Sequence, residues 1–192
     1  MSDPKADLRD YLQGGREALL WKLDGLSEHD VRRPLVPTGT NLLGLVKHVA
    51  GTAVGYLGEV FDRPFPEELP PYSEVGDMYA TADESRDDVI GFWHRAWAHA
   101  DATIEALPLD AVGRVWWWPE DRSEVTLHHV LVHLVAEVQR HAGHADLVRE
   151  LVDGTAGLLP RSSNLPDRDA AWWREHHDRV AQAAADAAAR WP

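Results

Sequence analysis

Residues 123–154 read SEVTLHHVLVHLVAEVQRHAGHADLVRELVDG, and this stretch decides the fold class of the 192-residue chain. Within it, the apolar residues Val130, Leu134, Val138 and Val148 recur on one face of an α-helix. Gly154 follows the last apolar residue and is favourable just past a helix end. The pattern therefore predicts one long amphipathic helix from about residue 123 to residue 152.

The same helical period predicts four further helices, which are separated by segments rich in proline and glycine. Their expected ranges are 5–26, 42–61, from Thr81 or Asp83 to residue 107, and 167–191. Thr40 or Asn41 can cap the second of these helices. A proline-rich segment is expected to cross between two bundle helices; it contains Pro64, Pro66, Pro70 and Pro71. No convincing strand pair is found, and residues 113–119 are expected to form a loop or a short extended piece.

These elements predict an all-α protein. Residues 1–160 are expected to form a four-helix bundle with a long crossover connection, because long amphipathic helices bury their apolar faces against one another. Residues 161–192 are expected to form a C-terminal helical extension that packs on the bundle.

Composition narrows the class of function. The net charge is −13, which disfavours nucleic acid and anionic membrane surfaces as partners. No run of about 18 apolar residues occurs, and the first residues lack the apolar stretch of a signal peptide. We therefore expect a cytoplasmic protein. The chain has no cysteine, which excludes disulfides and any internal thiol nucleophile.

Histidines and one glutamate suggest a metal site on the long helix. His133, Glu137 and His141 lie four residues apart, so they form one stripe beside the apolar face. A carboxylate and an imidazole one turn apart can bind the same cation. The alternative is an ordinary exposed ion pair between Glu137 and His141, which stabilises a helix by a few tenths of a kcal/mol.

A lone imidazole, His48, lies among apolar residues of the helix expected at 42–61. Three glycines lie within about two helical turns of His48: Gly44, Gly51 and Gly55. Each glycine inside a helix lowers the stability of the helix by roughly 1 kcal/mol relative to alanine. Room for a ligand and a close helix crossing are the two physical reasons for such glycines. His48 is therefore either a metal ligand or a hydrogen-bonded core residue.

Two motifs resemble a known family. TNLLGLVKHVA at residues 40–50 and EVQRHAGHAD at residues 137–146 are similar to the DinB-like (YfiT-like) superfamily of four-helix bundles. The resemblance is to an actinobacterial branch near the mycothiol-dependent maleylpyruvate isomerases, and it covers roughly residues 5–155.

The resemblance implies a divalent metal, zinc or nickel, bound by His48, Glu137 and His141. Many members have histidine where this chain has Glu137, and the glutamate moves the likeness towards the thiol-dependent isomerases. His144 or His133 could add a further ligand or a second contact to the site. Metal-bound imidazoles usually donate their other N–H to a carboxylate or carbonyl, so His141 is expected to have such a partner.

The function that follows is a metal-dependent transferase or isomerase that acts on a small molecule with a low-molecular-weight thiol such as mycothiol. Three protein ligands leave a coordination position open for chemistry. One alternative is a metal-dependent hydrolase. The other is a non-catalytic metal-binding bundle with an interaction role, for example as a homodimer.

The run from Trp116 to Trp118 leaves two interpretations open. The rings could form one wall of a substrate pocket. They could instead cover the end of the bundle or form a subunit contact, because aromatic residues are enriched in cores and in interfaces.

Overall fold

The computed structural model describes residues 3–69 and 77–191. Pro70 and Pro71 of the predicted crossing segment lie outside the described residues, as do Met1 and Ser2 of the N-terminal sequence. Contacts divide the chain into two compact units, Met1–Ser162 and Ser163–Pro192. The second unit contains helix α6, Ala170–Arg190, and Asp169 caps it by accepting a hydrogen bond from the backbone N–H of Trp172. The expected packing of this extension on the bundle stays a prediction.

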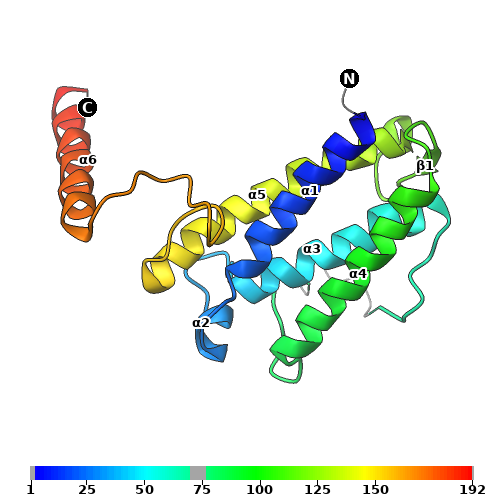
Figure 1. Cartoon of the computed structure of the whole chain (residues 1–192), viewed down its shortest axis with the longest axis horizontal. Coiled ribbons are helices and arrows are strands. Elements are labelled where there is room, and N and C mark those ends of the chain that lie inside the picture. Colours follow the sequence, from blue (N-terminus) through cyan, green and yellow to red (C-terminus); the bar gives the residue numbers. More distant parts are fainter. Residues whose placement is uncertain (1–2, 70–76, 192) are drawn as a thin grey trace. The chain divides into compact units, whose positions relative to one another are not determined.

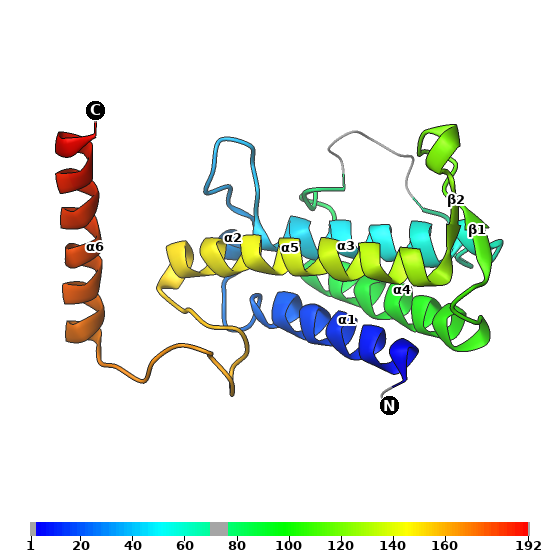
Figure 2. The same cartoon turned by 90° about the horizontal axis from the view of Figure 1, so that it is seen from above.

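The first unit contains the predicted four long helices, and the all-α fold class is confirmed. They are α1 (Pro4–Trp21), α3 (Leu42–Leu57), α4 (Arg86–Ala106) and α5 (Leu127–Asp153). Helix α3 packs mainly on α4 and α1 packs mainly on α5, while α3 also contacts α5 (Figures 1 and 2). Within the described residues, no helix is long and apolar enough to cross a membrane.

The core of this unit consists of leucine, valine and alanine side chains from all four helices, together with Trp93 and Trp97 of α4. In α5, Val130, Leu134, Val138 and Val148 are all buried, as the helical spacing predicts. Burial of an apolar side chain of this size contributes about 1.5–3 kcal/mol, so this face fixes the rotation of α5 in the bundle.

Helix ends follow local capping chemistry. The Asn41 side chain accepts a hydrogen bond of 2.8 Å from the backbone N–H of Gly44, so Asn41 rather than Thr40 caps α3. Gly154 ends α5 in the left-handed conformation with φ 78°, as predicted. Helix α4 begins at Arg86 and not near Thr81 or Asp83, because Ser85 and Asp88 form a capping box.

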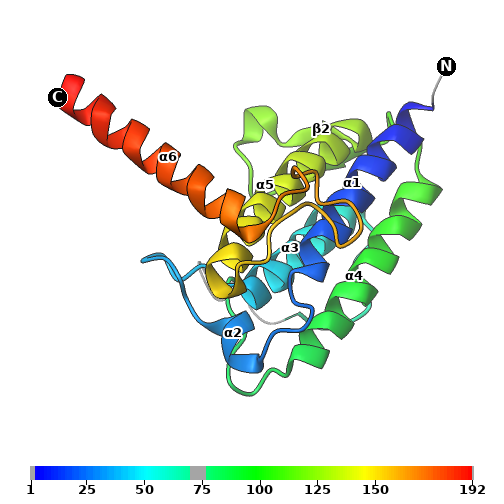
Figure 3. The ribbon, with the colours of Figure 1, turned by 60° about the vertical axis from the view of Figure 1, so that its left-hand side comes forward.

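Helix α1 is shorter than predicted. It ends at Trp21. A separate short helix, α2 (Glu28–Arg32), follows it, and Ser27 caps the N-terminus of α2. Figure 3 shows α2 at the same end of the bundle as the start of α4. The Arg86 guanidinium donates to the Leu26 carbonyl at this end, so the connection after α1 is fixed by tertiary contacts.

The expectation that no strand pair forms is wrong. Strands β1 (Val112–Arg114) and β2 (Glu124–Thr126) form a short antiparallel hairpin in which Gly113 pairs with Val125. A Cβ atom at Gly113 would lie 2.5 Å from the Val60 carbonyl oxygen, so this glycine allows the hairpin to approach the short 3-10 helix Glu59–Phe61 that follows α3. Three-residue strands are too short to show the alternating pattern that identifies strands in a sequence. Helix α5 therefore begins at Leu127, four residues later than predicted.

Candidate metal centre

Helices α3 and α5 bring three predicted ligands together. His48 lies on α3, and Glu137 and His141 lie one turn apart on α5. One possible ligand atom from each residue lies within 4.8 Å of the other two. His141 is buried, whereas His48 and Glu137 are half-buried. The three side chains therefore surround one point, and two of them are partly exposed to solvent.

Glu137 lies between the two imidazoles. Its Oε1 atom is 3.0 Å from Nε2 of His141 and 3.6 Å from Nε2 of His48. The centroids of the two rings are 4.8 Å apart, with the rings edge to face. The alternative of an exposed Glu137–His141 ion pair does not describe this geometry, because His48 and the burial of His141 complete a three-residue cluster.

A carboxylate that the sequence analysis missed lies behind His48. Oδ2 of Asp77 is 2.7 Å from Nδ1 of His48, which leaves Nε2 directed at Glu137. Such a partner is expected for His141, yet Nδ1 of His141 is buried without a hydrogen-bond partner among the described residues. Asp77 lies between α3 and α4, and no spacing in the sequence connects it with His48.

The ionisation of the cluster suits a cation. Burial alone raises the pKa of Glu137, but the hydrogen bond with His141 and the two nearby imidazoles outweigh burial and hold that pKa below its ordinary value. Burial lowers the pKa of His141, and the hydrogen bond with Glu137 offsets this only in part. At neutral pH the site therefore offers an anionic carboxylate and a neutral His141, the forms that bind metals.

The two additional histidines lie outside the cluster of three. His144 is exposed, and its ring centroid is 5.4 Å from that of His141. His133 is half-buried, and its ring packs against Tyr56 and Trp118 at centroid distances of 4.8 and 5.2 Å. Burial lowers the pKa of His133, and the Glu137 carboxylate opposes this shift.

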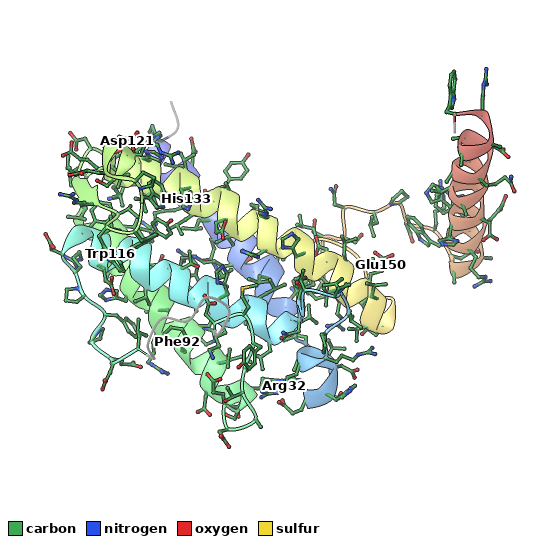
Figure 4. The ribbon with its side chains drawn as sticks, turned by 180° about the vertical axis from the view of Figure 1, so that it is seen from behind. Arg32, Phe92, Trp116, Asp121, His133 and Glu150 are labelled. Atoms are coloured by element: carbon green, nitrogen blue, oxygen red, sulfur yellow. The ribbon has the colours of Figure 1, made fainter. Side chains whose placement is uncertain are left out.

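The tryptophan run covers the end of α3 near His133. Nε1 of Trp118 donates to the Tyr56 hydroxyl at 2.9 Å, and the Trp117 ring packs edge to face on Tyr56. Figure 4 shows His133 on α5 towards the end of the bundle where Trp116 lies. Trp116 and Trp117 keep 69% and 39% of their surface exposed, so these rings both cover the bundle end and border solvent. Their use as a pocket wall stays a prediction.

The glycines of α3 separate into two kinds. A Cβ atom at Gly44 would collide with the Met78 carbonyl, and one at Gly55 would lie 3.4 Å from the Trp117 ring, so these two glycines permit close approach. A Cβ atom at Gly51 would meet no described atom within 4 Å. Gly51 lies one turn beyond His48, so the face of α3 next to the cluster carries no side chain there.

The residues present fit a bound cation. One carboxylate and two imidazoles form a donor set typical of zinc sites with an open position. The Asp77–His48 hydrogen bond is typical of metal-binding imidazoles, and the buried Nδ1 of His141, which has no partner among the described residues, is a free donor or acceptor beside the cluster.

Comparisons with known proteins bear on the family and the fold of the chain. A family model described as Mycothiol-S-transferase matches residues 7–154. A crystal structure of a conserved protein from Enterococcus faecalis superposes with a TM-score of 0.60 at 15% sequence identity, covering 81% of this chain and 100% of the other, which supports the fold. A comparison with curated proteins gives no match. Because the family model spans well over half of the sequence, the chain belongs to the mycothiol-S-transferase family, a DinB/YfiT-like family.

Proposed function

We propose that the protein is a metal-dependent transferase or isomerase that uses a low-molecular-weight thiol such as mycothiol. His48, Glu137 and His141 would hold a divalent cation, zinc or nickel. The observation that carries this proposal is the meeting of three donor groups from α3 and α5 in a chain of the mycothiol-S-transferase family.

The chemistry of the proposal is thiol activation. A divalent cation held by these residues would act as a Lewis acid and would lower the pKa of a thiol that binds to it. The Glu137 carboxylate supplies the one negative charge among the three donors. Because the chain contains no cysteine, the thiol comes from outside and no internal thiolate competes for the site.

The reactants are proposed to bind on the side of the site that is exposed to solvent. His141 is buried beneath the cluster, whereas His48 and Glu137 keep part of their surface exposed. A small thiol can therefore approach over the bare face of α3 at Gly51. Trp117, which packs over Gly55 one turn further along, borders this approach and is proposed to contact the electrophile.

The test begins with the metal. Protein prepared without chelators or affinity metals is analysed for its elements, and apoprotein is titrated with Zn²⁺ and Ni²⁺. We expect one ion per chain. Mycothiol, glutathione and cysteine are then each supplied with 1-chloro-2,4-dinitrobenzene: the thiolate sulfur forms a bond to the ring carbon, chloride leaves with the bonding electrons, and the thiol proton goes to the buffer.

Metal-dependent product formation with at least one thiol supports the proposal. Absence of metal uptake contradicts it, and so does equal turnover by the apoprotein. A Glu137→Gln variant should lose both metal and turnover, whereas His128→Ala, which removes an exposed histidine from the same helix, should keep both. Hydrolysis of 4-nitrophenyl acetate that needs metal but no thiol would replace the proposal with a metal-dependent hydrolase.

A further inference from the structure

Asp77 belongs to a segment that polar contacts hold against α3. The Asn41 side chain donates to the Met78 carbonyl at 3.2 Å, and Lys47 donates to the Tyr79 carbonyl at 3.2 Å. Lys47 also forms an ion pair of 2.7 Å with Glu84. We call residues 77–84 the strap.

The far end of the strap is held by α2. The Arg32 guanidinium donates to the carbonyl of Thr81 at 3.0 Å and to that of Glu84 at 2.7 Å. The contacts of the strap thus begin at the first turn of α3 and extend to α2, so the backbone on both sides of Tyr79 is fixed. A carboxylate at one end of such a segment has a defined position.

Gly44 makes this arrangement possible. A Cβ atom at Gly44 would run into the Met78 carbonyl oxygen, so only glycine lets the strap lie this close to α3. Met78 follows Asp77 directly, and Gly44 precedes His48 by one helical turn. The close approach at Gly44 therefore brings the Asp77 carboxylate to the His48 ring.

We infer that Asp77 is a positioning residue of the metal centre: it holds the proton of His48 on Nδ1 and so directs the Nε2 lone pair at Glu137, with Gly44 and Asn41 setting its place. This inference rests on the proposed metal-binding function. A neutral imidazole carries one N–H, and a carboxylate 2.7 Å from Nδ1 accepts it. The same contact restrains rotation of the ring.

The expected loss of metal affinity is taken from comparable residues in other metal sites. Removal of a carboxylate that orients a metal-binding histidine typically weakens metal affinity by about 10–100-fold. Asp77 is 45% exposed in its side chain, so its replacement leaves no buried cavity. A loss of affinity in an Asp77 variant would therefore reflect the hydrogen bond to His48 and not a failure to fold.

The experiment measures Zn²⁺ affinity of purified full-length protein by competition with a chromophoric chelator. We expect Asp77→Ala to weaken binding by about 10–100-fold. Asp83→Ala is the matched control, because it removes the same charge from an exposed position of the strap; we expect no measurable change. Gly44→Ala should weaken binding although it touches no ligand, whereas Gly14→Ala, another helix glycine with open space beside it, should not.

A second readout does not depend on metal. In the apoprotein with ¹⁵N-labelled histidine, two-dimensional NMR shows which ring nitrogen of His48 carries the proton. We expect Nδ1–H in the wild type and in Asp83→Ala, and a shift towards Nε2–H in Asp77→Ala. An Nε2–H tautomer in the wild type, or wild-type Zn²⁺ affinity in Asp77→Ala, overturns the inference. Failure of the wild type to bind any metal overturns the proposed function instead, and the tautomer still decides the role of Asp77.

Discussion

Oε1 of Glu137 lies 3.0 Å from Nε2 of His141, one turn further along the same helix. The hydrogen bond with His141 lowers the pKa of Glu137 and so favours the anionic carboxylate, whereas burial lowers the pKa of His141 and outweighs the opposing effect of Glu137. His48 from α3 completes the cluster, so α5 supplies two donors with fixed spacing and α3 supplies the third.

The first prediction concerns the donor set. Replacing His48 or His141 with alanine should weaken Zn²⁺ binding by more than about 100-fold, which exceeds the usual effect of residues that only orient a ligand. Equilibrium dialysis with elemental analysis measures the change. His144→Ala, an exposed neighbour on α5, should bind Zn²⁺ as the wild type does; equal losses in all three variants would contradict the three-residue assignment.

The second prediction compares two adjacent glycines of α1. A Cβ atom at Gly15 would lie 2.8 Å from Cγ1 of Val138, whereas one at Gly14 would meet no described atom within 4 Å. Gly15→Ala should lower the free energy of unfolding by about 1–3 kcal/mol through overpacking between α1 and α5. Gly14→Ala should raise it by about 0.5–1 kcal/mol, since alanine loses less backbone entropy in a helix. Urea denaturation measures both, and changes of the same sign would refute the packing argument.

The third prediction concerns the aromatic cluster at the end of α3. Tyr56→Phe removes the oxygen that accepts the N–H of Trp118, so this partly buried donor loses its partner. The free energy of unfolding should fall by about 0.5–1.5 kcal/mol. Tyr79→Phe is the matched control because its side chain is 49% exposed and its described contact uses the backbone carbonyl. A thermal denaturation series that shows equal effects for the two variants would contradict this role.

The fourth prediction is a pH dependence of stability. Two hydrogen bonds from the buried Arg149 hold the pKa of Asp153 below its ordinary value of 3.8. A carboxyl group with a lowered pKa in the folded state stabilises the fold fully above the unfolded value, and this contribution is lost as the pH falls through the folded value. Asp153→Asn should therefore lower Tm at pH 7 by roughly 1–3 °C.

The difference between Asp153→Asn and the wild type should shrink as the pH falls below 3.8. Calorimetry at a series of pH values follows both proteins. Asp110→Asn, at an exposed position, serves as the control and should leave Tm unchanged at every pH. A difference between Asp153→Asn and the wild type that stays constant across the series would show that ionisation of Asp153 contributes nothing.

Local patterns predicted most of the fold. The apolar spacing of α5, the Gly154 end and the Asn41 cap each depend on residues within a few positions of one another, so the sequence contains the whole signal. The prediction for residues 5–26 was too long at its C-terminal end because α1 ends at Trp21. The hairpin of Val112–Arg114 and Glu124–Thr126 was missed because its stability comes from pairing and from contact with the segment Glu59–Phe61, not from its three-residue strands.

By itself the sequence determined the spacing of Glu137 and His141, because a helix places residues four apart on one face whatever surrounds it. It also determined that any thiol must come from outside, since there is no cysteine. The family resemblance implied that His48 joins this pair, but no spacing in the sequence requires it; the tertiary structure brings His48 to the pair, and it alone decided that Asp77 lies behind His48. Such contacts join residues far apart in the chain, and only the packing of α3 on α5 and the close approach at Gly44 bring them together.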